Sequence, residues 1–97
     1  MALGEDTAWV LWPEYFDRSR PRSQGRKVKK GSAINDPKVD LLSAALRQLG
    51  LQHKVEREKK YPANWFSSDG RVLVEKTMPK SQLIKKVGEL LIKSQRS

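Results

Sequence analysis

Two segments of this 97-residue chain carry apolar residues along one side of a helical path, and they constrain the fold more than any other feature. The first begins after Asp36, whose carboxylate can cap the first turn, with Pro37 at its first position. It ends at Gly50, where glycine favours a left-handed turn. The second follows Thr77-Met78-Pro79. Each predicts an amphipathic helix whose stripe must be covered by another element. The stripes are Val39, Leu42, Leu46 and Leu49, and Leu83, Ile84, Val87, Leu90 and Leu91.

Three shorter segments have the pattern of β-strands. Residues 8–12 are rich in β-forming side chains and are apolar on both sides, which predicts a strand in the centre of its sheet. Residues 51–56 alternate between apolar and polar, as in a half-buried strand, and residues 71–76 form a third strand. The second and third strands are joined by a non-helical segment, 57–69, so we expect them to be antiparallel.

The order of these elements, β-α-β-β-α, predicts an α+β two-layer sandwich, in which two helices pack on one face of a small three-stranded sheet. A chain of this length forms a single domain, 1–97. We expect flexible ends at residues 1–7 and 94–97.

Positive charge is concentrated in one place. Residues 18–30 contain seven basic side chains and no acidic one, in a chain of net charge +9. Taking these seven from the 20 Lys and Arg leaves 13 against 11 Asp and Glu, so the excess is local. The segment lies in a long loop, 13–36, and loops of this length in compact domains are usually functional or disordered. Its field would attract nucleic acid first, then anionic membranes and acidic proteins.

The composition argues against catalysis and bound cofactors. The chain has no cysteine, which excludes disulfides, thiolate metal sites and cysteine nucleophiles. Its one histidine, His53, falls in the alternating strand, where we expect a structural role. We find no phosphate-binding glycine motif, no apolar run long enough for a membrane span and no signal-peptide pattern. We therefore expect a cytoplasmic, non-enzymatic protein without cofactor or metal.

A binding function is favoured, with RNA as the ligand. Arginine binds phosphate through a two-pronged fork, and aromatic rings near the loops can stack on unpaired bases. No helix displays a basic face of the kind that reads a DNA groove. The second loop, 57–70, adds lysines and aromatic residues, but the two loops can form one surface only if they leave the same edge of the sheet.

We expect Trp9 and Trp12 to pack in the sheet rather than to stack on bases. Residues 18–30 should stay mobile until RNA screens their charges.

Five short motifs in order resemble one known family. They are "WPEYFD", "QGRKV", "AINDP", "KKYPANW" and "GRVLVEK", and they span about residues 9–92. The chain resembles the 19-kilodalton subunit of the signal recognition particle, in its short archaeal form. The resemblance implies a monomeric β-α-β-β-α protein that binds the particle's 7S RNA, a ribonucleoprotein component of protein targeting to the membrane.

The same resemblance implies a mechanism and a set of contacts. The family clamps the tetraloops of two parallel hairpins, helices 6 and 8, and so orders the RNA for the GTPase subunit, which it meets indirectly through the RNA. The chain departs from the common pattern at Pro21, at Lys29-Lys30-Gly31 and at Pro79. The implied RNA-binding residues are Tyr15, Arg18, Arg20, Gly25, Arg26, Lys27, Lys59, Lys60, Tyr61 and Trp65.

Three alternatives remain open. One is another small RNA-binding protein, such as a ribosomal component. A second is an adaptor that docks the last helix, with its lysines, on acidic proteins or an anionic membrane. A nuclease is the third. The lysines in question are Lys80, Lys85, Lys86 and Lys93.

Overall fold

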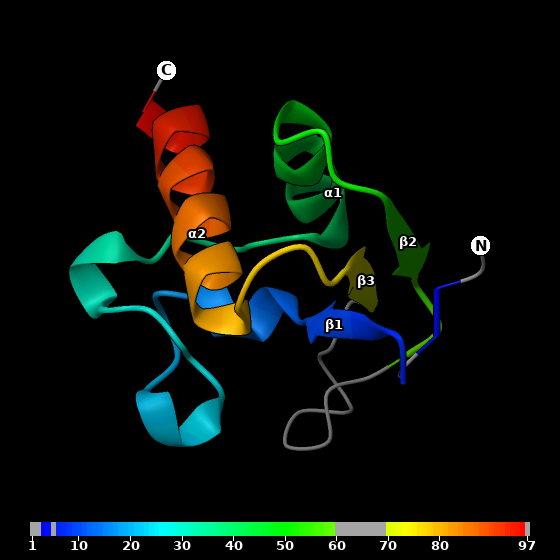
Figure 1. Cartoon of the computed structure of the whole chain (residues 1–97). Coiled ribbons are helices and arrows are strands. Elements are labelled where there is room, and N and C mark those ends of the chain that lie inside the picture. Colours follow the sequence, from blue (N-terminus) through cyan, green and yellow to red (C-terminus); the bar gives the residue numbers. More distant parts are fainter. Residues whose placement is uncertain (1–2, 5, 60–69, 97) are drawn as a thin grey trace.

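The computed structural model describes residues 3–4, 6–59 and 70–96, and these follow the predicted order β-α-β-β-α (Figure 1). The regular elements are β1 (Ala8–Leu11), α1 (Val39–Gln48), β2 (His53–Glu56), β3 (Arg71–Glu75) and α2 (Lys80–Arg96). Between β1 and α1 the chain forms three short 3-10 turns, at Pro13–Phe16, Arg22–Gln24 and Lys30–Ser32. The predicted fold class is confirmed.

The sheet has the order β1-β3-β2, and both outer strands run antiparallel to β3. The antiparallel pairing of the second and third strands is therefore confirmed. The prediction that the first strand is central was wrong, because β1 lies at an edge and β3 occupies the centre. Four consecutive residues of β3 are buried, as expected of a strand with neighbours on both sides. An apolar strand indicates that its side chains are buried. Segments outside the sheet can bury them as well as neighbouring strands can, so the pattern does not fix a central position.

The aromatic side chains of the first strand illustrate this burial at an edge. The indole N–H of Trp9 donates a hydrogen bond to the backbone oxygen of Met78, at 2.8 Å, in the connection between β3 and α2. The ammonium group of Lys76 lies 4.6 Å from the centre of the same ring. Trp12 is buried in the core. Both tryptophans therefore pack against the fold, as predicted.

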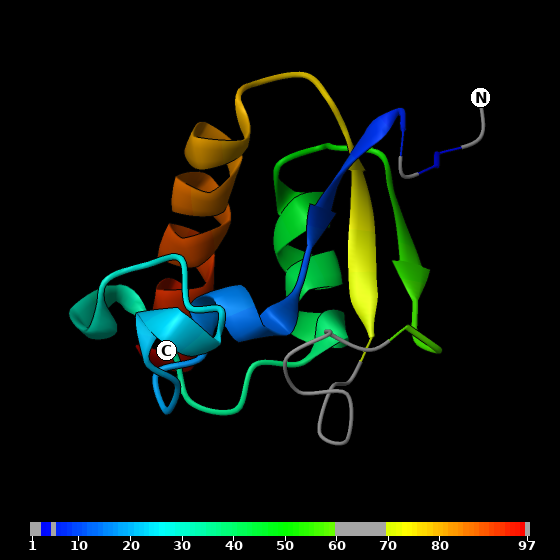
Figure 2. The same ribbon diagram turned by 90° about the horizontal axis from the view of Figure 1, so that it is seen from below.

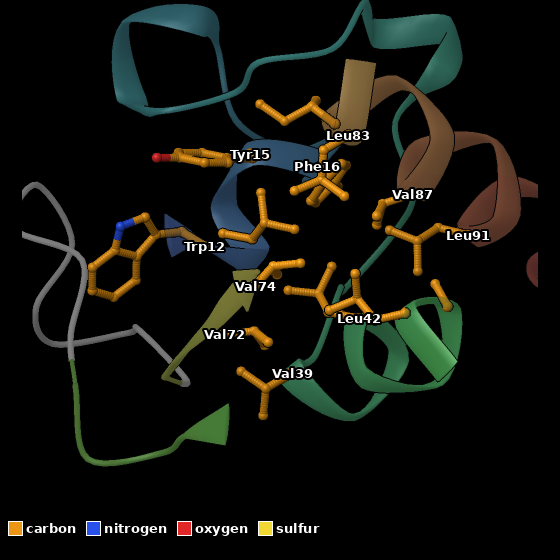
Figure 3. Packing of buried hydrophobic residues seen from close by; sticks show 14 of the residues in the cluster. Trp12, Tyr15, Phe16, Val39, Leu42, Val72, Val74, Leu83, Val87 and Leu91 are labelled. Atoms are coloured by element: carbon orange, nitrogen blue, oxygen red, sulfur yellow. The ribbon is translucent and has the colours of Figure 1, made fainter. Parts of the chain in front are cut away.

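Both helices cover the same face of the sheet (Figure 2). The side chains of Val72 and Val74 on β3 point between the helices, where they meet the stripes of α1 and α2 (Figure 3). The predicted helix stripes are thus the two halves of one hydrophobic core. Phe16, just after β1, is fully buried in the same cluster. None of the helices that the structure describes is long and apolar enough to cross a membrane.

Helix α1 begins later than the sequence predicts. Asp36 does not cap it: this residue has a φ of 49° and its carboxylate lies 3.4 Å from the Lys38 ammonium. Lys38 is extended, and Val39 is the first helical residue. Aspartate tolerates the left-handed region better than most residues, so Asp36 can adopt the backbone turn that precedes the helix. The end of α1 is as predicted, with Gly50 at a φ of 71°.

His53 has the structural role that its position predicts. Its Nδ1 lies 3.0 Å from the backbone oxygen of Leu51, and its Nε2 lies 2.8 Å from the hydroxyl oxygen of Ser43 on α1. A carbonyl can only accept, so Nδ1 carries a proton and donates to Leu51. The imidazole thus joins β2 to α1.

Candidate nucleic-acid interface

The loops that follow β1 and β2 leave the same end of the sheet. Because both strands are antiparallel to β3, they run in the same direction. Their last residues, Leu11 and Glu56, pair with Val72 and Arg71 at the start of β3. The condition under which both loops can contribute to one surface is therefore met, and Figure 2 shows the ends of β1 and β2 on one side.

A buried ion pair holds this end of the sheet together. The Nε of Arg71 lies 2.6 Å from Oε1 of Glu56, with side chains only 9% and 12% exposed. The guanidinium carbon of Arg71 also lies 5.6 Å from the centre of the Trp12 ring, next to the end of β1. One side chain on the central strand thus contacts the residues from which both loops depart.

Little of the second loop lies within the described residues. Lys59 is exposed at its start. Lys60, Tyr61 and Trp65, which the sequence assigned to RNA binding, lie outside the described residues. Their meeting with the first loop therefore stays a prediction.

The first loop is closed at its base. We call residues 18–33 the basic loop. Just outside it, Asp17 and Ile34 form an isolated parallel bridge. The backbone N–H of Arg18 donates to the oxygen of Ile34, and the N–H of Ile34 donates to the oxygen of Phe16, both at 2.8 Å. The two ends of the basic loop are thus joined beside the core.

Two further contacts fix the path of the basic loop. The backbone N–H of Lys27 donates to the oxygen of Tyr15 at 2.8 Å. The side chain of Val28 packs against the core, over Gly88 of α2, where an added Cβ would lie 3.7 Å from the valine. Ile34 is buried, and Val28 is half-buried. Val28 within the loop and Ile34 at its base both attach the segment to the fold.

Five of the seven basic side chains of this loop line one hollow in the surface, of about 450 Å³. Arg18 and Arg22 are exposed, whereas Arg20 and Arg26 are half-buried. Five cationic residues around one concave site make a strongly positive field that suits a polyanion better than a small neutral ligand. The residues that line it are Arg18, Ser19, Arg20, Pro21, Arg22, Arg26 and Lys30.

Gly25 marks the turn at the tip of this loop. Its φ is 111°, in the region where a side chain is strained, and its N–H donates to the oxygen of Arg22 at 3.2 Å. The backbone here needs glycine for its own conformation. Whether RNA approaches it closely stays a prediction.

Tyr15 lies in a different setting from the one that base stacking requires. It is 6% exposed and its ring belongs to the core, while its hydroxyl points away from the buried cluster (Figure 3). Lys27 and Lys80 hold their ammonium groups 5.5 and 5.2 Å from the ring centre. In this conformation the ring supports two cations at the edge of the interface and has no open face for a base.

The phenol of Tyr15 and the amine of Lys80 are in contact, at 3.3 Å. Burial raises the pKa of the Tyr15 hydroxyl above its ordinary value, and the nearby Glu14 carboxylate raises it further. Burial lowers the pKa of the Lys80 amine. At neutral pH the phenol therefore keeps its proton.

Three basic residues of the site were absent from the residues assigned by sequence. Arg22 and Lys30 line the hollow, and Lys80 contacts Tyr15. Arg22 and Lys30 could have been assigned from the concentration of basic residues at 18–30, but they lie outside the family motifs from which the contacts were taken. Lys80 is distant in sequence, and no local pattern connects it with the loop.

Comparisons with known proteins place these features in a family. The sequence model of the family described as SRP19 protein matches residues 10–94. The chain is 42% identical over 87 residues to the signal recognition particle 19 kDa protein of Methanosarcina mazei. This alignment covers 90% of this chain and 85% of that protein. It is 38% identical over 78 residues to the protein of the same name from Methanobrevibacter smithii, with 80% and 88% covered.

Solved structures agree with this likeness. A crystal structure of SRP19 in complex with the S domain of signal recognition particle RNA has a TM-score of 0.81 and 35% identity, and the match covers 86% of this chain and 95% of that one. The protein of an SRP19 complex with S-domain RNA from Sulfolobus solfataricus has a TM-score of 0.74 and 32% identity, with 92% of each chain covered.

Proposed function

The chain belongs to the SRP19 protein family, and from this premise we propose that it is an RNA-binding assembly subunit of the signal recognition particle. The observation that carries the proposal is the hollow lined by five basic side chains at one end of the sheet. The similar proteins in solved complexes hold the S domain of the particle's RNA. The ligand of this chain is then the same RNA.

Binding begins with electrostatic attraction. The positive field of the basic loop draws in RNA phosphates, and the counterions released on contact drive association. The arginine side chains then bind phosphate oxygens through paired N–H groups, which fixes the orientation of the RNA. Because the loop is joined to the core at Ile34 and Val28, the phosphates meet a shaped surface.

At finer detail, the protein clamps the tetraloops of two parallel hairpins, helices 6 and 8 of the RNA. The basic loop holds one RNA tip, and the loop after β2, with Lys59, Lys60 and Tyr61, helps to hold the other. The shared direction of β1 and β2 supports this, because it starts both loops at one end of the sheet. Holding the hairpins side by side preorganises the RNA for the GTPase subunit, which this protein meets through the RNA.

The role is structural. The protein acts as a monomer in the cytoplasm, without a cofactor and without catalysis. Its specificity comes from the distance between two RNA tips, which only a folded RNA with both hairpins presents correctly.

The experiment is a footprint and an affinity measurement on particle RNA whose two hairpin tips are altered one at a time. We expect protection at both tips on the intact RNA, and a loss of affinity of at least about tenfold when either tip is changed. A ribosomal RNA fragment at matched salt is the control. Equal affinity for that fragment would favour a ribosomal component and contradict the proposal, as would protection of one tip only.

A further inference from the structure

An acidic residue, Asp17, lies at the base of the basic loop, and its carboxylate contacts residues within that loop. Oδ1 of Asp17 accepts hydrogen bonds from the backbone N–H of Ser19, at 2.9 Å, and from the Ser19 hydroxyl, at 2.7 Å. Its Oδ2 lies 3.3 Å from Nε of Arg20, and both of these side chains are less than one fifth exposed. The carboxylate thus fixes the first turn of the loop and the direction of one arginine.

Arg26 makes a second set of internal contacts from the opposite side of the loop. Its Nε donates to the backbone oxygen of Val28, at 2.9 Å, and its Nη1 donates to the backbone oxygen of Arg20, at 2.8 Å. One guanidinium therefore ties two separated parts of the loop together. Arg20 is shared: its side chain meets Asp17 and its carbonyl meets Arg26.

These contacts reduce the charge available to RNA. Asp17 opposes a phosphate by Coulomb repulsion and partly neutralises Arg20, and Arg26 directs two of its five N–H groups inward. If charge alone set the affinity, both arrangements would be unfavourable. A loop of like charges, however, tends to expand when nothing holds it. Ordering such a loop on binding costs affinity, and a loop already held in the bound shape avoids that cost.

We propose that Asp17 and Arg26 are positioning residues, which hold the basic loop in its RNA-binding shape before RNA arrives. Asp17 then strengthens RNA binding in spite of its negative charge. Arg26 acts through the loop carbonyls as well as through its charge. The inference rests on the proposed RNA-binding function.

The two accounts of Asp17 predict opposite signs. Asp17→Asn removes one negative charge and the ion pair with Arg20 while keeping the size of the side chain. Positioning predicts that particle RNA binds about threefold or more weakly. Charge alone predicts tighter binding, because the net charge rises by one.

The matched control is Asp36→Asn, which adds the same charge outside the basic loop. Asp36 is exposed and has a φ of 49°, a conformation that asparagine also tolerates. This variant should bind RNA equally or slightly more tightly. Tighter binding by both variants would overturn the positioning role. Absence of particle-RNA binding by the wild-type chain would instead overturn the proposed function.

Arg26 is tested by a substitution that keeps its charge. Arg26→Lys cannot place two fixed N–H groups on the two carbonyls, so we expect about tenfold weaker binding with an unchanged salt dependence. Arg47→Lys is the control, because Arg47 is exposed on α1, outside the basic loop and the hollow. It should change the affinity less than about threefold. Equal effects of the two substitutions would contradict a positioning role for Arg26.

An RNA-free measurement completes the test. In the free protein the amide of Lys27, bonded to Tyr15, should be protected from hydrogen exchange. The protection should fall in Arg26→Lys and persist in Arg47→Lys. An unprotected Lys27 amide in the wild-type chain would overturn the inference and support the mobile loop that the sequence predicts.

Discussion

Arg71 and Glu56 form a buried ion pair across the central and outer strands at the point where the second loop departs, with Nε and Oε1 2.6 Å apart. The same arginine lies against Trp12, beside the departure of the first loop. The relative position of the two loops therefore depends on a charged contact within the sheet.

Glu56→Ala should lower the free energy of unfolding by about 3 kcal/mol, because it removes the carboxylate that lies against the buried Arg71 guanidinium. The control is Arg57→Ala, which removes an exposed pair with Asp40 and should cost less than about 1 kcal/mol. Urea unfolding of the two variants measures the difference. Similar losses would show that the buried pair does not stabilise the sheet.

Three glycines should differ in their tolerance of alanine, in an order set by geometry. Gly70 has a φ of 97°, and a Cβ there would lie 2.7 Å from the backbone oxygen of Glu56. Gly70→Ala should cost about 3 kcal/mol or more, from strain and collision together. Gly50→Ala has the strain alone, since no atom lies within 4 Å of the added Cβ, and should cost about 1–2 kcal/mol.

The control in this series is Gly31→Ala, where no atom lies within 4 Å and φ is not positive. It should change the free energy of unfolding by less than about 1 kcal/mol. Thermal or urea unfolding of all three variants gives the order. A Gly70 variant as stable as the Gly31 variant would disprove the close approach to Glu56.

RNA affinity should fall steeply with salt. Neutralising about five phosphates gives a log–log slope of about −4. Arg22→Gln should make the slope shallower by about 0.9, because Arg22 lines the hollow. Lys54→Gln, an exposed change on β2, should leave the slope unaltered. A wild-type slope near zero would exclude electrostatic capture.

Stability should fall at high pH through Tyr15. Its pKa in the folded protein is raised by burial, above 10.0. The folded state then holds this proton more tightly than the unfolded state does. The resulting stabilisation is present below pH 10 and is lost as the pH rises through the folded pKa.

Tyr15→Phe isolates this effect, because every other titrating group is common to both chains. The free energy of unfolding should decline less above pH 10 in the phenylalanine variant than in the wild type. At pH 7 the variant should be less stable by about 1 kcal/mol, for the lost contact with Lys80. Parallel pH profiles would show that the phenol is not buried from solvent.

Local sequence patterns were sufficient to predict the helices and strands of this fold. The stripes of Leu42 and Leu83, at three- and four-residue spacing, lie on the two helices that cover the sheet. The alternation around His53 and Val55 lies on β2, and the left-handed glycine at 50 ends α1. Each of these signals depends on periodicity or on a single backbone angle, and so on residues close in sequence.

Contacts between residues far apart in the sequence could not be predicted from such local patterns. The apolar first strand suggested a central position, but it lies at an edge, where Trp9 is half-buried against the connection at Met78. Tyr15 looked available for stacking, but its ring fills the core beside α2. Asp36 looked like a helix cap, but the chain turns there first. For Trp9 and Tyr15 a partner far along the chain decided the outcome, whereas for Asp36 the angle of its own backbone did.

The sequence by itself determined the α+β class, the two amphipathic helices and the concentration of positive charge in residues 18–30, because composition and periodicity are local properties. Only the tertiary structure decided that β3 is central, that both loops start at one end of the sheet, and that Asp17 and Arg26 shape the basic loop. Strand order depends on which surfaces meet when the chain closes its core, and no short stretch of residues contains that information. The contacts of Asp17 and Arg26 are close in sequence, but they depend on the backbone path of the loop, which composition and periodicity do not specify.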